Sequence, residues 1–133
     1  MLVTKNTKNF LIIASFMMAV VIAIGAFGAH GLKATNDEYM MAIYNTGVQY
    51  HFYNTLGLFA IALITHFLPN SKQIVVSGYL LILGTLIFSC SLYLLVILKV
   101  SWLGAITPFG GTLMIISWMV IGFTVLNELK IKE

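Results

Sequence analysis

Long apolar stretches separated by short polar segments are the dominant pattern of the chain. Four such stretches cover about residues 10–29, 48–68, 74–98 and 108–126. An α-helix of about 20 residues rises roughly 30 Å, which is the thickness of the hydrocarbon core of a bilayer. The pattern predicts an all-α integral membrane protein, an antiparallel four-helix transmembrane bundle in which residues 1–133 form a single membrane domain.

The second apolar stretch is preceded by a segment that is too polar for the bilayer core. Asn36 is followed by two acidic residues, a pattern typical of a helix N-terminus with the asparagine as its cap. One helix from there to Leu68 would be about 46 Å long, too long for a single crossing. We therefore expect Asp37–Thr46 to lie at the interface, Gly47 to allow a bend, and the crossing to begin at Val48.

Small and turn-forming residues mark the other helices. The segment from Pro69 to Lys72 predicts a tight turn, and Thr107-Pro108 predicts an N-cap followed by proline at the first helical position. Repeated small residues predict surfaces where a neighbouring helix approaches closely. They recur every seven positions at Ser77, Gly84 and Ser91, and every four at Ser15, Ala19 and Ala23.

The first apolar stretch also has some features of a signal peptide. Ala26–Gly28 loosely fits a small-x-small cleavage site. The apolar region is longer than the core of a typical signal peptide, so we expect it to remain as a helix.

Residues 46–58 form the most polar part of the membrane region, with amide, histidine, aromatic and glycine residues close together. At about 100° per residue, Gln49 and Tyr53 lie on one side of a helix, whereas His51 and Asn54 lie on another. Two polar sides cannot both face hydrocarbon without protein neighbours. This pattern predicts that the second helix lies at the centre of the bundle.

The composition narrows the class of protein further. Hydrophobic residues make up 60% of the chain and charged residues 8%, whereas a soluble domain carries about 25% charged residues. All seven basic residues are lysines, which excludes an arginine clamp for phosphate and leaves no basic cluster for nucleic acid. The single cysteine, Cys90, excludes an internal disulfide and a multi-cysteine metal site.

The positions of the lysines predict an orientation. With four spans, both termini share one side with Lys5, Lys8, Lys72, Lys130 and Lys132, and only Lys33 and Lys99 lie on the other. Because lysines concentrate on the cytoplasmic side of membrane proteins, we expect a multi-pass protein of the cell membrane with cytoplasmic termini. The formal charge of +3 then reflects membrane-flanking lysines and indicates no acidic partner.

Four motifs carry a resemblance to a known family. They are GAFGAHGL at residues 25–32, TGVQYH at 46–51, FSCSLY at 88–93 and LGAITPFGG at 103–111. In this order they resemble the membrane proteins grouped as domain-of-unknown-function 423, or uncharacterised protein family 0382, whose animal members are called transmembrane protein 256. The resemblance covers almost the whole chain and implies a four-span membrane protein without an established activity. Members often carry a second histidine three residues after the one matching His51, but this chain has Asn54 there.

The same four motifs fall at one face of the predicted bundle, opposite the termini, because neighbouring spans are antiparallel. Their polar residues are therefore expected to meet within a turn or two of that interface. This candidate polar cluster consists of His30, Gln49, His51, Asn54, Ser89, Ser91, Tyr93 and Thr107.

Three kinds of chemistry are conceivable for this cluster, and each lacks a component. His30, His51 and Cys90 are few ligands for zinc, and His66 lies roughly 22 Å from His51 along the helix. Ion-coupled transport usually needs a charged residue within a span, and none is present. Catalysis by Ser89 or Ser91 with His51 would lack an acid to orient the histidine. Hydrogen bonding between helices explains the same residues more simply.

The sequence therefore predicts a non-enzymatic membrane protein without cofactor or metal, whose polar cluster binds a partner, a lipid or a small ligand. The alternative is a facilitator or channel for a small solute, with His51 and Gln49 lining the path. The expected partners are the lipid bilayer and a membrane protein or a second copy of the chain, with no nucleic acid.

Overall fold

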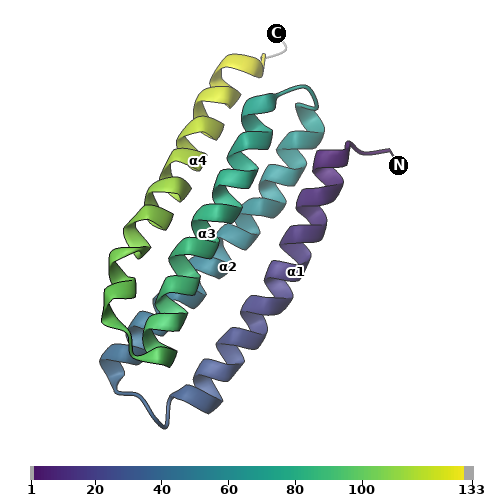
Figure 1. Cartoon of the computed structure of the whole chain (residues 1–133). Coiled ribbons are helices and arrows are strands. Elements are labelled where there is room, and N and C mark those ends of the chain that lie inside the picture. Colours follow the sequence, from purple (N-terminus) through teal and green to yellow (C-terminus); the bar gives the residue numbers. More distant parts are fainter. Residues whose placement is uncertain (1, 131–133) are drawn as a thin grey trace.

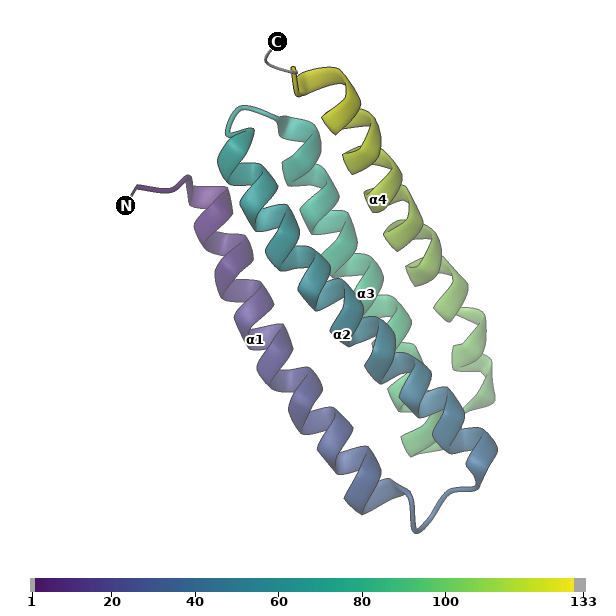
Figure 2. The same cartoon turned by 180° about the vertical axis from the view of Figure 1, so that it is seen from behind.

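The computed structural model describes residues 2–130, which form four long helices and two short helical segments. The long helices are α1 (Lys5–Phe27), α2 (Glu38–Phe67), α3 (Lys72–Leu98) and α4 (Thr107–Glu128). A π-helical segment, η1 (Gly28–Leu32), extends α1, and a 3-10 segment, η2 (Ser101–Ala105), precedes α4. Consecutive helices run in opposite directions, so the α1–α2 and α3–α4 connections lie at the end opposite the termini (Figure 1; Figure 2 from behind).

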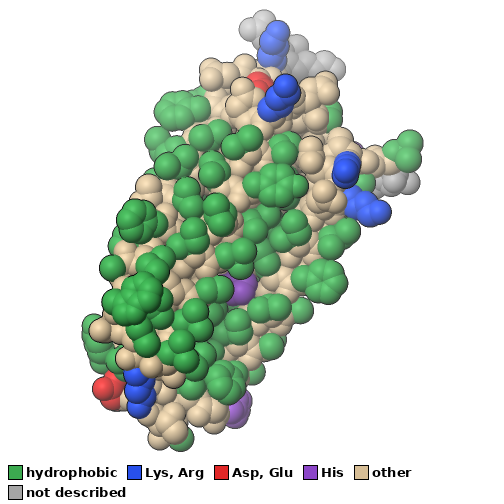
Figure 3. Space-filling model, viewed as in Figure 1, with side chains coloured by type: hydrophobic (Ala, Val, Ile, Leu, Met, Phe, Trp, Pro, Cys, Tyr) green, Lys and Arg blue, Asp and Glu red, His purple; other side chains and the backbone are tan. Residues whose placement is uncertain are grey.

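Three helical segments in the described part of the chain are long and apolar enough to cross a membrane, namely Lys5–Leu32, Lys72–Leu98 and Ser101–Glu128. α2 is not among them, because its first half carries the polar residues noted above. On the face shown in Figure 3, charged side chains gather at the two ends of the molecule and hydrophobic side chains cover the middle. This distribution suits a bilayer, whose hydrocarbon core excludes charge.

α2 differs from expectation at its start and at Gly47. Its N-cap is Asp37, whose Oδ1 accepts a hydrogen bond of 2.8 Å from the Met40 amide, so the prediction of Asn36 as the cap is wrong by one residue. The helix continues without interruption through Gly47, where a bend was expected. A Cβ at this position would lie 2.8 Å from the Tyr93 ring, so the glycine allows α3 to approach α2.

The small residues of α3 allow α4 to pack closely against it. Ser117 donates to the Ser77 carbonyl at 2.8 Å, and a Cβ at Gly84 would lie 2.8 Å from the Gly110 carbonyl oxygen. The heptad of small residues predicted from the sequence is therefore the face of α3 that contacts α4.

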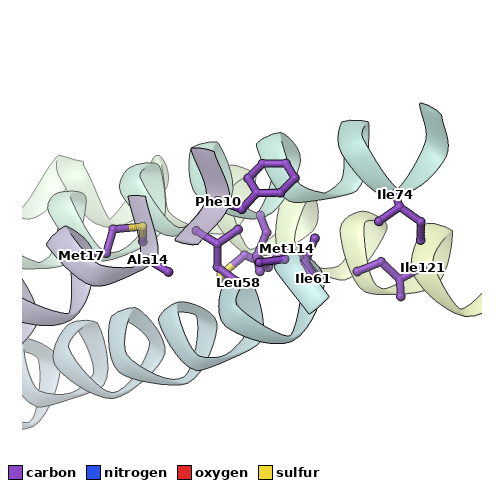
Figure 4. Close-up of a cluster of buried hydrophobic side chains, with 10 residues drawn as sticks. Phe10, Ala14, Met17, Leu58, Ile61, Ile74, Met114 and Ile121 are labelled. Carbon is purple, nitrogen blue, oxygen red and sulfur yellow. The ribbon is translucent and has the colours of Figure 1, made fainter. Parts of the chain in front are cut away.

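α3 shares the centre of the bundle with α2. In the most apolar 18-residue stretch of each helix, 50% is buried in α3, compared with 22% in α1 and 28% in α4. The prediction that the second helix alone is central was thus incomplete. The apolar core between the four helices includes Phe10, Leu58 and Met114 (Figure 4).

α1 packs through a face other than the one that carries its small residues. Its small residues Ser15, Ala19 and Ala23 are exposed, so the close approach predicted for them is wrong. The buried face is formed by larger side chains, with Phe10 against Gly78 of α3 and with Ala14, Met17 and Val21 along the same side.

Candidate functional site

The interior of the bundle holds a polar layer between α2, α3 and the start of α4. His51 is only 5% exposed, and its Nδ1 lies 3.2 Å from the hydroxyl of Tyr93, which is also buried. Nε2 of His51 is buried and has no hydrogen-bond partner within the described residues. The histidine therefore contributes one bond between α2 and α3.

The hydroxyl groups of α3 complete this layer and use their hydrogen-bonding capacity within the protein. Ser89 donates to the Gly47 carbonyl of α2 at 2.8 Å. The hydroxyls of Ser91 and Thr107 are 2.7 Å apart, which joins α3 to the first residue of α4. Such bonds fix how neighbouring helices are aligned, with a contribution of about 0.6 kcal/mol each in a membrane. The N-cap of α4 is Ile106, so the prediction of Thr107 as the cap is wrong by one residue.

Asn54 is buried nearby but points toward α4. Its amide nitrogen donates to the Tyr50 carbonyl at 2.8 Å and to the sulfur of Met114 at 3.1 Å. Its oxygen accepts a long bond of 3.4 Å from the indole nitrogen of Trp118. Asn54 thus belongs to a second polar contact, between α2 and α4.

His30 and Gln49 do not join the other predicted residues, and their assignment to one cluster was wrong. Both side chains are exposed. The His30 ring bonds to the carbonyl of Ala26 in the preceding turn, and Gln49 lines a hollow between α1 and α2. The error has a simple cause. The position of each motif along its helix was inferred correctly, because all four motifs lie at one end of the bundle (Figure 1). The direction in which each side chain points around its helix axis was not.

A large hollow lies beside Asn54, between α2 and α4. Its volume is about 680 Å³, and its wall is mostly aromatic and apolar, from Tyr50, Tyr53, Phe88, Gly111, Met114 and Trp118. Tyr50 stacks on Phe88 with ring centroids 4.8 Å apart. The partial exposure of Tyr50, Tyr53 and Trp118, 43%, 58% and 41%, shows that this α2–α4 cleft opens sideways along the bundle.

The hydrophobic pattern of the sequence did not predict this cleft. A Cβ at Gly57 would lie 2.5 Å from the Trp118 ring, so this glycine accommodates the indole against α2. The signal was present in the sequence as a glycine one turn after Asn54, but its partner on α4 could be assigned only from the packing.

The described residues contain no group of three or more histidine, cysteine or acidic side chains placed to hold a metal ion. Cys90 is exposed on α3. The buried polar side chains between the helices are therefore hydroxyls, the imidazole of His51 and the amide of Asn54. These groups bind neutral or weakly polar molecules through hydrogen bonds.

Comparison with known proteins shows that the chain is similar to a family of membrane proteins. Residues 24–111 match the family model described as protein of unknown function (DUF423). The chain is 41% identical over 114 residues to the UPF0382 membrane protein YwdK of Bacillus subtilis, covering 86% of this chain and 93% of the relative. UPF0382 membrane proteins of Staphylococcus epidermidis and Staphylococcus haemolyticus are 40% and 38% identical, each over 86% of this chain and 92% of the relative. No solved structure matches the chain.

Proposed function

The chain belongs to the DUF423 family of membrane proteins, and from this premise we propose that it binds a lipophilic small molecule in the α2–α4 cleft. All four helices cross the membrane in this proposal, with both termini in the cytoplasm, and the role is binding without catalysis. α2 crosses despite its polar residues because His51 and Asn54 are shielded by α3 and α4. The single observation that carries the proposal is a buried amide in an aromatic, laterally open cleft of about 680 Å³.

The bonds of Asn54 suit exchange with a ligand. A thioether sulfur is a weak acceptor, and the bond from Trp118 at 3.4 Å is long. A carbonyl or hydroxyl oxygen in the cleft would therefore be a better acceptor for the Asn54 amide than Met114 is. The aromatic wall would cover the apolar part of the same molecule. The predicted ligand class is an apolar molecule that bears one such oxygen and enters from the bilayer.

The polar layer around His51 has a supporting role in this proposal. Its bonds to Tyr93 and from Ser89 to Gly47 hold α2 against α3, which fixes the rotation that directs Asn54 toward α4. A channel lined by both His51 and Gln49 has less support, since His51 is buried against α3 and Gln49 is exposed beside α1.

The cleft can be tested by filling it. Gly111 lines the cleft, and a Cβ there would have only ordinary contacts, 3.7 Å from the Phe88 ring. The variant Gly111→Val is expected to fold and to occupy space needed by the ligand. Protein purified in a mild detergent would be extracted with organic solvent, and the extract analysed by mass spectrometry.

The matched control is Gly122→Val, on the same helix, because nothing lies within 4 Å of a Cβ at that position. We expect one class of lipophilic compound to be enriched over bulk lipid with the parent chain and the control, and lost with Gly111→Val. Identical extracts from all three proteins would contradict the proposed function.

A further inference from the structure

A second hollow surface runs along the opposite side of α2, in the groove between α1 and α2. The two helices lie side by side in both views (Figures 1 and 2). Asn45 and Gln49 are exposed on this side of α2. They are one turn apart, so they form a short row of amides along the helix. An exposed amide in hydrocarbon lacks the hydrogen bonds that water would give it. We therefore expect this row of amides to hydrogen-bond to a bound molecule.

The groove is charged at the end that carries the α1–α2 connection. A hollow of about 340 Å³ there is lined by Lys33, Asn36, Glu38 and Asn45. It contains one positive and one negative side chain, both exposed, and no ion pair joins the two within the described part of the chain. Charged side chains at the end of a membrane helix lie at the depth of lipid headgroups.

The groove becomes apolar toward the middle of the bundle. An adjoining hollow of about 450 Å³ shares Gly25 with the charged one and is lined by Ile22, Val48, Gln49 and Phe52. Gly25 lines both hollows, so they adjoin over the surface of α1. From Glu38 to Asn45 is about 10 Å along α2, and from Asn45 to Gln49 about 6 Å. The groove therefore changes from charged, through amide, to apolar over the depth in which a phospholipid makes the same change.

We infer that the α1–α2 groove, with Lys33 and Glu38 at its mouth and Asn45 and Gln49 below them, binds one phospholipid that has a primary ammonium in its headgroup. Lys33 binds the phosphate and Glu38 binds the ammonium. The amides of Asn45 and Gln49 donate to the ester carbonyls, and an acyl chain lies over Gly25 between α1 and α2. Charge complementarity favours a zwitterionic headgroup, since an anionic lipid would leave Glu38 facing a negative charge. A primary ammonium also donates hydrogen bonds to the Glu38 carboxylate, which a quaternary ammonium cannot do.

A second copy of the chain is the competing occupant, because amides are both donors and acceptors and can pair with themselves. The shape of the surface favours the lipid. Two copies related by a two-fold axis would face each other with the same hollow, and the interface would enclose a void at its centre. A flexible acyl chain fills such a groove without a void. The inference rests on the proposed crossing of the bilayer by α2 and is independent of the α2–α4 cleft.

The test is a lipid titration of the purified full-length chain, followed by native mass spectrometry. The probes are phosphatidylethanolamine, phosphatidylcholine and phosphatidylglycerol with identical acyl chains. We expect phosphatidylethanolamine to bind most tightly. Lys33→Gln and Glu38→Gln are each expected to weaken it about tenfold, the effect of losing one hydrogen bond to a charged group.

Matched variants separate the groove from general effects of charge and from the other cleft. Lys99→Gln removes a lysine at the same end of the bundle but beside α3, and it is expected to leave the affinity unchanged. Lys33→Arg should retain most of the binding. Gly111→Val, which fills the α2–α4 cleft, should also leave it unchanged, so a failure of one proposal is distinguishable from a failure of the other.

Three results would overturn the inference. The first is equal affinity for phosphatidylethanolamine in the parent chain, Lys33→Gln and Glu38→Gln. The second is tighter binding of phosphatidylglycerol than of phosphatidylethanolamine. The third is efficient disulfide cross-linking of Gln49→Cys between chains in the membrane, in a Cys90→Ser background, which would identify a second copy as the occupant. A monomeric Gln49→Cys protein under the same oxidation supports the lipid.

Discussion

The imidazole of His51 is held between two helices by a single hydrogen bond, from or to the hydroxyl of Tyr93 at 3.2 Å. Both side chains are more than nine-tenths buried. In such a place a polar side chain has few alternative partners, so the bond fixes the relative position of α2 and α3.

Tyr93→Phe removes this bond and leaves the aromatic ring, including its contact with Gly47. We expect the free energy of unfolding in detergent to fall by about 0.6 kcal/mol, up to roughly 1.7 kcal/mol, the range measured for bonds between membrane helices. The measurement is equilibrium unfolding followed by circular dichroism. Tyr39→Phe, at a residue that is 72% exposed, is the control and should have no effect. Equal stability of both variants would mean that the His51–Tyr93 bond contributes nothing.

Gly28 makes a second prediction at the scale of the residue. A Cβ there would overlap the ring of Tyr44, which is 1% exposed and donates from its hydroxyl to the Ile24 carbonyl at 2.8 Å. Gly28→Ala should therefore displace the ring and destabilise the protein by about 1–3 kcal/mol, as overpacking of a core does. The loss would be measured as a lower midpoint of thermal unfolding.

Gly25→Ala is the control for Gly28→Ala, because a Cβ at Gly25 would lie at an ordinary 3.5 Å from Val48. Its stability should be close to that of the parent chain. If Gly28→Ala unfolds at the same temperature as Gly25→Ala, the Tyr44 ring is not confined as the packing indicates.

Residue types were predictable from the sequence at this scale, but their partners were not. The 3.6-residue period separates Gln49 from His51, and it correctly gives them different sides of α2. It does not specify which neighbour faces each side. Asn54 was therefore grouped with Tyr93 although it bonds to Met114 and Trp118.

At the scale of the element, the repeat of small residues in α3 was the most informative pattern. Ser77, Gly84 and Ser91 are seven residues apart and therefore lie on one face, and all three contact α4 in the structure. The equivalent pattern in α1 wrongly predicted a close helix contact, because small residues do not by themselves require a neighbouring helix. They permit close packing where a neighbour is present and tolerate exposure to lipid where none is.

The closest point between α3 and α4 predicts a specific intolerance. A Cβ at Gly110 would overlap the Phe88 backbone nitrogen and lie 2.7 Å from the Gly84 carbonyl oxygen. Backbone atoms cannot move aside as a flexible side chain does, so Gly110→Ala should force the two helices apart. We expect a loss of about 1–3 kcal/mol in the free energy of unfolding, measured by thermal unfolding in detergent.

Gly122→Ala is the matched control, on the same helix and with nothing within 4 Å of the added atom. It should be neutral or slightly stabilising, because alanine favours helix over glycine by about 1 kcal/mol. The prediction for Gly110 would be wrong if both alanine variants behaved alike.

At the scale of the molecule, the sequence predicted which helix ends lie together, because long apolar helices joined by short loops alternate in direction. The sequence did not predict the π-helical end of α1, the α2–α4 cleft or the α1–α2 groove. A cleft exists where side chains on two helices fail to fill the space between them, and this depends on rotation and on pairs such as Gly57 with Trp118. Hydrophobic periodicity contains no information on such pairs when every face of a helix is apolar.

Both proposals depend on the crossing of the bilayer by α2, which can be tested directly. Only three segments of the described chain qualify as spans by length and hydropathy, and we attribute the lower hydropathy of α2 to residues that α3 and α4 shield.

Single cysteines at Lys8, Lys33, Lys72 and Lys99, in a Cys90→Ser background, can be labelled in intact cells with a thiol reagent that does not cross membranes. We expect labelling at Lys33 and Lys99, and at Lys8 and Lys72 only after the cells are opened. Lys33 and Lys72 flank α2, so labelling of both in intact cells would show that α2 does not cross. In that case Asn45 and Gln49 would face water, and the exposed amides would need no lipid.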